Sequence, residues 1–134
     1  MMLNGALAGL VAITAEPLTP GPILAMCIGS IGAAIMYFGT KFLESLSLDD
    51  VVGAIPVHMF AGIFGTLVVP LSNSDTNFGT QFLGVVSVCL FSFIFSYAVF
   101  RTLKETIGLR ISKSAERLGT DKAEVGVSAY SIRD

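Results

Sequence analysis

Charged side chains divide the sequence into long apolar stretches separated by short polar connectors. Residues 17–40, 51–74 and 76–100 contain no Asp, Glu, Lys or Arg, and residues 1–15 are likewise uncharged. A helix that crosses a bilayer needs about 17–25 predominantly apolar residues, so the three longer runs are sufficient. The pattern predicts four helical segments, at residues 1–15, 21–45, 50–71 and 76–106.

Strands explain these runs poorly, because membrane strands need roughly ten-residue segments of alternating polarity, whereas residues 82–100 are continuously apolar. Prolines separate the first two segments, since proline suits only the first turn of a helix. We therefore predict an all-α membrane protein with a polytopic helix bundle. Residues 1–15 are short for a span and form either a re-entrant helix or part of a span that begins upstream; we favour the second.

The composition agrees with this fold class. Of the 134 residues, 53% are hydrophobic and 13% are charged, whereas soluble domains carry about 25% charged residues. The net charge of −2 offers no basic face for a nucleic acid. No Ser/His/Asp set, paired intramembrane carboxylate or phosphate loop occurs, and Cys27 and Cys89 lack zinc-like spacing. We expect neither enzyme activity nor a metal or cofactor.

Lysine and arginine gather after the last apolar run, which predicts that residues 108–134 form a cytoplasmic tail. The connector at 41–50, which carries Lys41, then also lies in the cytoplasm, and the loops at 16–20 and 72–75 lie outside. Among the basic residues of the last helix and tail are Arg101, Lys104, Arg110, Lys113 and Arg117.

Small residues recur within the predicted spans and allow membrane helices to approach closely. They indicate helices that pack on one another rather than a single-span anchor. They are Gly5, Gly9, Gly29, Gly32, Ala33, Gly62 and Gly65.

His58, the only histidine, lies within an apolar span, and ionisable groups at that depth usually face a bundle interior or a pathway. Helical spacing places a largely small-residue face around it, which would line a narrow passage or accept a close neighbour; the alternative is a histidine that only specifies packing. Val57, Phe60, Phe64 and Leu67 form a bulkier stripe on another face. The residues predicted to share the face of His58 are Ala54, Ile55, Ala61, Gly62 and Gly65.

The start of the same segment carries capping signals. Asp49 and Asp50 can cap free N–H groups at the helix start. Pro56, one turn further on, should leave the carbonyl of Val52 without its usual helical donor and kink the helix before His58.

Three motifs resemble the ammonium transporter family. NGALAGLVAITA at 4–15 is similar to the opening of its eighth transmembrane helix, and DDVVGAIPVHMFAGIFGTL at 49–67 is similar to its tenth. GLRIS at 108–112 resembles the start of the cytoplasmic tail, and Gly119, Asp121, Gly126 and Tyr130 fit the spacing of that tail.

The resemblance implies a trimer with eleven helices and one pore per subunit, located in the cell membrane. This chain would hold the eighth to eleventh helices, with His58 as the second of two pore histidines and Thr14 close to the conduction path. Ile55 and Gly62, on the face of His58, are the further candidates for the pore wall. The implied function is passage of ammonium or ammonia.

The partner histidine belongs to the first half of the family fold, which this sequence lacks, so we expect a partial transporter that does not conduct alone. The tail has Val125 and Val127 where many members carry histidine and glutamate, which argues against docking of a PII-type regulatory protein at 108–134. Two alternatives stay open: a membrane ammonium-sensor domain, and a structural membrane subunit without a passage.

Overall fold

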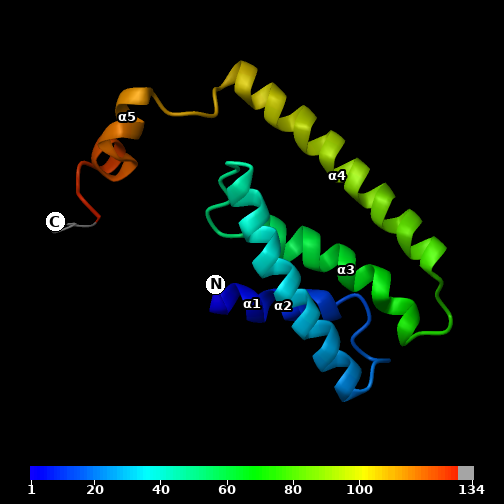
Figure 1. Ribbon diagram of the computed structural model, residues 1–134. Coiled ribbons are helices and arrows are strands. Elements are labelled where there is room, and N and C mark those ends of the chain that lie inside the picture. Colours follow the sequence, from blue (N-terminus) through cyan, green and yellow to red (C-terminus); the bar gives the residue numbers. More distant parts are fainter. Residues whose placement is uncertain (130–134) are drawn as a thin grey trace. The chain divides into compact units, whose positions relative to one another are not determined.

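The computed structural model describes residues 1–129, which form helices joined by turns, with no strand among them (Figure 1). The all-α fold is therefore confirmed, while Tyr130 lies outside the described residues. The chain divides into two units, Met1–Phe91 and Ser92–Asp134. The helices are α1 (Met2–Ile13), α2 (Pro22–Ser45), η1 (Ile55–Phe60), α3 (Ala61–Val68), η2 (Val69–Leu71), α4 (Phe78–Thr106), α5 (Lys113–Leu118) and η3 (Asp121–Val125).

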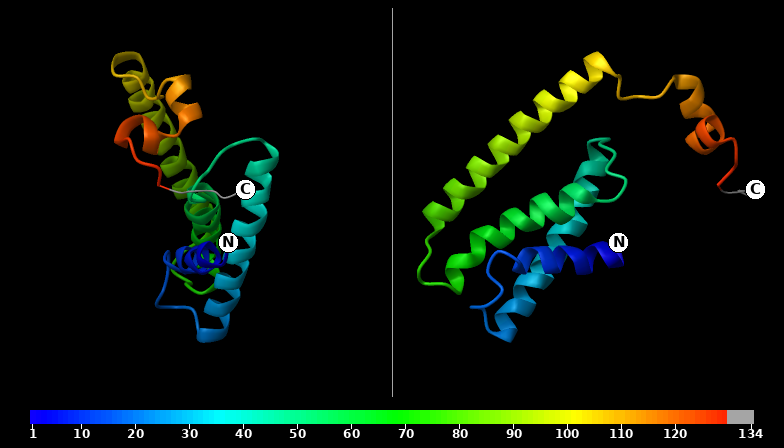
Figure 2. Two further views of the ribbon diagram at one scale, coloured as in Figure 1. Left: turned by 90° about the vertical axis from the view of Figure 1, so that its left-hand side faces the viewer. Right: turned by 180° about the vertical axis from the view of Figure 1, so that it is seen from behind.

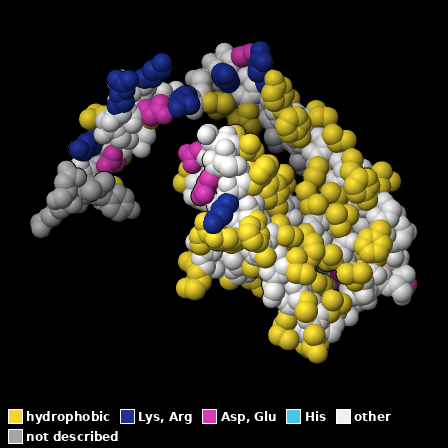
Figure 3. Space-filling view, viewed as in Figure 1, with side chains coloured by type: hydrophobic (Ala, Val, Ile, Leu, Met, Phe, Trp, Pro, Cys, Tyr) yellow, Lys and Arg dark blue, Asp and Glu magenta, His cyan; other side chains and the backbone are white. Residues whose placement is uncertain are grey.

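Among residues 1–129, two helices are long and apolar enough to cross a membrane, α2 with 24 residues and α4 with 29. The other two apolar helices are shorter. One is α1, and the second, Ile55–Leu71, consists of η1, α3 and η2 in unbroken succession and is called the His58 helix below. On the face shown in Figure 3, hydrophobic side chains cover the long helices, whereas Lys and Arg side chains gather at the end of α4 and in the tail.

Glycine and alanine bring the helices of the first unit into close contact. A Cβ placed on Gly9 of α1 would lie 3.1 Å from the carbonyl oxygen of Gly29 in α2, and one on Gly32 would lie 2.6 Å from the Ala12 Cβ. Larger side chains at these positions would push the helices apart. The small residues therefore act in helix packing, as the sequence predicts.

The directions of the three packed helices follow from these contacts. Gly5 faces Met36 and Gly9 faces Gly29, so α1 and α2 are antiparallel. Asn4 contacts the residues just before the His58 helix and Ala12 contacts Gly65 within it, so α1 and the His58 helix run in the same direction. Figure 2 shows α2 packed across both. A small core of Ala8, Met36, Val57 and Ala61 lies at their junction.

Two hydrogen bonds join the loop after α1 to the turn after the His58 helix. The Thr19 hydroxyl donates to Ser72 Oγ over 3.2 Å, and Asn73 Nδ2 donates to the Glu16 carboxylate over 2.9 Å. The two loops therefore lie at the same end of the helices, consistent with their predicted location on one side of the membrane.

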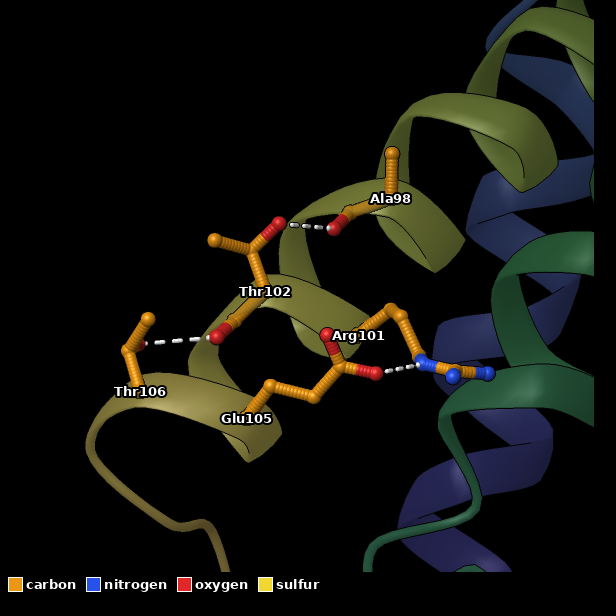
Figure 4. A network of polar contacts seen from close by, with 5 residues as sticks. All are labelled: Ala98, Arg101, Thr102, Glu105 and Thr106. Carbon is orange, nitrogen blue, oxygen red and sulfur yellow. Dashed lines mark hydrogen bonds and ion pairs between the residues drawn. The ribbon is translucent and has the colours of Figure 1, made fainter.

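The end of α4 carries polar contacts within the helix (Figure 4). The Thr102 and Thr106 hydroxyls donate to the carbonyls of Ala98 and Thr102 over 2.9 and 2.8 Å. Arg101 pairs with Glu105 one turn further on. The last two turns of α4 are therefore polar, unlike the apolar part of the helix before them, and their side chains bond to one another and to the helix backbone.

The tail beyond α4 has short helices held by polar side chains. Arg110 donates to the Glu116 carboxylate through Nη2 over 2.6 Å and through Nε over 3.3 Å. The Ser112 hydroxyl caps α5 by accepting from the Ala115 N–H. In η3, the Asp121 carboxylate accepts from the Ala129 N–H over 2.8 Å.

Candidate pore-lining site

The His58 helix begins later than the sequence predicts, at Ile55 rather than residue 50. Both carboxylate oxygens of Asp50 accept backbone N–H groups, from Ala54 over 2.9 Å and from Ile55 over 2.8 Å. Asp50 therefore satisfies the first free N–H groups of the helix, although the N-cap position itself is Ala54. The chain between Asp50 and Ile55 forms a turn in which Gly53 has φ +73°, and this non-helical turn places the helix start after Asp50.

Pro56 consequently lies in the first turn, not one turn inside the helix. In that position its missing N–H removes no intrahelical bond. The Val52 carbonyl nevertheless finds a donor elsewhere, because Asn4 Nδ2 of α1 donates to it over 2.9 Å. An amide from another helix thus takes the place of the expected helical N–H.

His58 lies in a π-helical segment, Ile55–Phe60. π-Helical turns are rare and occur frequently at functional sites. Within this segment Pro56 and Val57 are buried, whereas the side chains of Ile55 and His58 are exposed. The neighbouring side chains of Val57 and His58 therefore lie in different surroundings, one buried and one exposed.

Every fourth residue of this region is buried and forms the packing face, as i, i+4 spacing on a helix requires. Ala61, 0% exposed, belongs to this face and to the core with Ala8. Ala61 and Gly65 do not share the exposure of His58, because both pack against neighbouring helices. Of the two uses predicted for the small-residue face, these two residues serve the approach of a close neighbour. The buried series is Gly53, Val57, Ala61, Gly65 and Val69.

None of the four candidate pore residues is fully buried in the described structure. His58, Ile55 and Thr14 are exposed and Gly62 is half-buried. A Cβ on Gly62 would lie 3.7 Å from Val11 Cγ1, and the Thr14 hydroxyl donates to the Val11 carbonyl over 2.6 Å. Val11 of α1 thus links Thr14 to the surface of the His58 helix, one turn beyond His58.

Among residues 1–129, no group of three His, Cys, Asp or Glu side chains is placed to hold a metal ion. The chemistry at this surface therefore comes from one imidazole, one hydroxyl and apolar groups. An imidazole nitrogen and a hydroxyl oxygen can both accept a hydrogen bond from a small N–H donor.

The sequence as a whole identifies the family. Residues 1–130 match the sequence model of the Ammonium Transporter Family. The chain belongs to this family. The described residues are all-helical and include two apolar helices of membrane-crossing length, which is consistent with a partial helical membrane transporter fold.

Similar family members occur in archaea and cyanobacteria. Ammonium transporter Amt2 of Archaeoglobus fulgidus is 36% identical over 97% of this chain and 32% of its own length. A putative ammonium transporter of Synechocystis sp. is 37% identical over 92% of this chain and 25% of its own length. Ammonium transporter Amt1 of Haloferax mediterranei is 36% identical, with 96% and 26% covered. The chain therefore spans between a quarter and a third of these relatives.

Two residues of α1, Val11 and Asn4, contact the His58 helix or the turn before it but are not predicted from the sequence. Val11 is an ordinary apolar residue of an apolar helix and gives no signal. Asn4 does give one, because it is a lone amide in an uncharged stretch and Pro56 predicts a carbonyl in need of a donor. Connecting the two requires the tertiary fold, since Asn4 and Val52 lie on separate elements.

Proposed function

We propose that this chain supplies part of the wall of a passage for ammonium or ammonia across the cell membrane. The observation that supports this most directly is the position of His58. Its side chain is exposed, while the residue before it, Val57, is 1% exposed and packs in the core. An imidazole at membrane depth that does not serve the packing of its own chain is available to a pathway.

The chemistry of the four candidates suits a small nitrogen base. Stripping water from an ammonium ion is costly unless other groups replace its hydrogen bonds. The His58 imidazole can accept such a bond or take part in passing a proton. The Thr14 hydroxyl commits its proton to the Val11 carbonyl, so its oxygen is left to accept a bond from an N–H donor. Ile55 would exclude water, and Gly62 would leave room beside Val11.

The wider assembly is part of the same proposal. By resemblance, α1, α2, the His58 helix and α4 would correspond to the eighth to eleventh helices of a homotrimeric transporter whose tail is cytoplasmic. A second pore histidine would come from the part of the fold absent here. The tail at 108–134 would be the docking segment for a PII-type protein, but Val125 and Val127 argue against such docking. The fraction of the relatives that the chain spans, 32% or less in the three cases above, supports a partial transporter.

The test uses cells that lack their own ammonium transporters and express the longest reading frame containing this chain. We expect His58→Ala to lower methylammonium uptake per transporter molecule by roughly tenfold to a hundredfold, the effect of losing a hydrogen bond to a charged group. Met59→Ala is the matched control, because Met59 is the next residue and is also exposed, at 47%.

Uptake by the His58→Ala protein equal to that of the Met59→Ala control would show that His58 takes no part in the passage. Methylammonium binding without uptake in the parent protein would instead favour the sensor alternative.

A further inference from the structure

Asn4 of α1 reaches the turn from which the His58 helix starts. Its Nδ2 donates to the carbonyl of Val52 over 2.9 Å. The next residue, Gly53, is buried and has φ +73°, and a Cβ placed there would lie 2.7 Å from the same Nδ2. Only glycine leaves the space that the Asn4 amide occupies and also adopts this φ without strain.

This turn is held from both sides of Gly53. On the side before Gly53, Asn4 fixes the Val52 carbonyl; on the side after it, the Asp50 carboxylate fixes the N–H groups of Ala54 and Ile55 over 2.9 and 2.8 Å. The Asp50 contact is local and moves with the helix start. The Asn4 hydrogen bond ties the turn to a different helix, α1, so it can set the position of the His58 helix against α1.

The other contacts described between α1 and the His58 helix are made by small or apolar residues. Along the shared face, Ala8 and Ala12 of α1 meet Val57, Ala61 and Gly65. Small apolar residues let the two backbones approach closely and so set the spacing of the helices, whereas a hydrogen bond from one helix to a backbone carbonyl of the other also has a preferred direction. A rotation of the His58 helix would change the direction of His58 together with its distance from Thr14.

We propose that Asn4 is a positioning residue that fixes the rotation and axial register of the His58 helix, and thereby the direction of the His58 imidazole. The inference rests on the proposed function for its effect on uptake, but not for its effect on His58 itself. Asn4 does not touch the transported species. It acts through the backbone of Val52, and through the helix that follows.

The test measures how fast diethyl pyrocarbonate modifies His58, followed by mass spectrometry of the peptide that contains it. The protein is the longest reading frame containing this chain, solubilised and selected for a monodisperse peak. Asn4→Asp keeps the size of the side chain and removes the donor, and Asn4→Ala removes the whole amide. We expect either variant to change the rate by about fivefold, the population shift that corresponds to one hydrogen bond of ordinary net strength.

Ser30→Ala is the matched control, because it also removes a side-chain donor to a backbone carbonyl, that of Met26 on the exposed side of α2. It should leave the modification rate unchanged. Gly53→Ala disturbs the same hydrogen bond from the other side, because the added Cβ would lie 2.7 Å from Asn4 Nδ2. It should change the modification rate as Asn4→Asp does. Agreement between the variants would show that the change does not come from misfolding of one of them.

Uptake separates positioning from simple stability. If Asn4 sets the fraction of transporters with a correctly directed His58, Asn4→Asp should lower maximal uptake per molecule and leave the half-saturating concentration unchanged. Modification rates equal to those of Ser30→Ala in all three variants would overturn the inference. A changed rate together with normal uptake by His58→Ala would instead keep the positioning role and overturn the proposed function.

Discussion

Gly65 of α3 lies directly against the backbone of Ala12 in α1, so that a Cβ at residue 65 would be 2.8 Å from the Ala12 carbonyl carbon. The contact is backbone to backbone, and no flexible side chain can move aside to relieve it. The spacing between α1 and the His58 helix therefore depends on the absence of a side chain at this position.

We expect Gly65→Ala to destabilise the protein by about 1–3 kcal/mol, the usual cost of overpacking a closely packed site. The free energy of unfolding, measured by titration with SDS in mixed micelles, checks this. Gly84→Ala is the control, because nothing lies within 4 Å of a Cβ at that position of α4. The control should be neutral or stabilising by up to about 1 kcal/mol, since alanine favours helix. Equal effects of the two substitutions would contradict the close contact.

Asp50 and its neighbour Asp49 provide a second comparison. Asp50 accepts two backbone N–H groups at the start of the His58 helix, so Asp50→Ala should cost about 1 kcal/mol, as removal of a helix cap usually does. Asp49→Ala removes the same charge one residue earlier and should change the free energy of unfolding by less than about 0.5 kcal/mol. Thermal unfolding followed by circular dichroism measures both. A larger effect at Asp49 would show that charge near the helix start, rather than the cap, decides its stability.

The elements of this fold are more predictable from the sequence than the faces of its helices. Charge-free runs reveal the helices because lipid excludes charge over a span-length segment. The same small residues, however, suit both a passage and a helix contact. Gly62 is half-buried whereas Ala61 and Gly65 are fully buried between helices, and composition cannot distinguish them.

The start of the His58 helix shows the second limit. A sequence with Asp49 and Asp50 before an apolar run predicts a cap but not which carboxylate forms it. The position of the turn depends on Gly53 taking a positive φ beside Asn4, a residue from another helix. Such a contact is a property of the tertiary fold, so neither element indicates it alone.

The tail should show a pH dependence centred on Asp121. The pKa of this carboxyl lies below its ordinary value of 3.8, chiefly because the Ala129 N–H donates to the carboxylate and secondly because of the Lys122 N–H. A lowered pKa in the folded tail means that the contact contributes fully above pH 3.8 and is lost as the pH falls through the lower, folded value.

The amide signal of Ala129, followed by NMR across a pH titration, measures this directly. We expect a transition with its midpoint below 3.8. In Asp121→Asn the residue no longer titrates, and the transition at Ala129 should disappear. A midpoint at or above 3.8 would show that the carboxylate gains nothing from the contact in solution.

The last prediction concerns orientation in the membrane. Hydrogen bonds place the loop at 16–20 and the turn at 72–75 at one end of the helices, and the basic residues after α4 predict that this end is outside. In a background with Cys27→Ser and Cys89→Ser, Ser74→Cys should react with a membrane-impermeant maleimide on intact cells. Ser114→Cys, in the tail, should react only after the cells are permeabilised.

Thr19→Cys adds a check that does not depend on the charge rule. Because the Thr19 hydroxyl bonds to Ser72, a cysteine at 19 must label from the same side as one at 74. Labelling of 19 and 74 from opposite sides would contradict the packing of α1, α2 and the His58 helix. Labelling of 114 on intact cells, with 19 and 74 protected, would leave that packing intact and reverse only the orientation, because the distribution of basic residues then would not decide the topology.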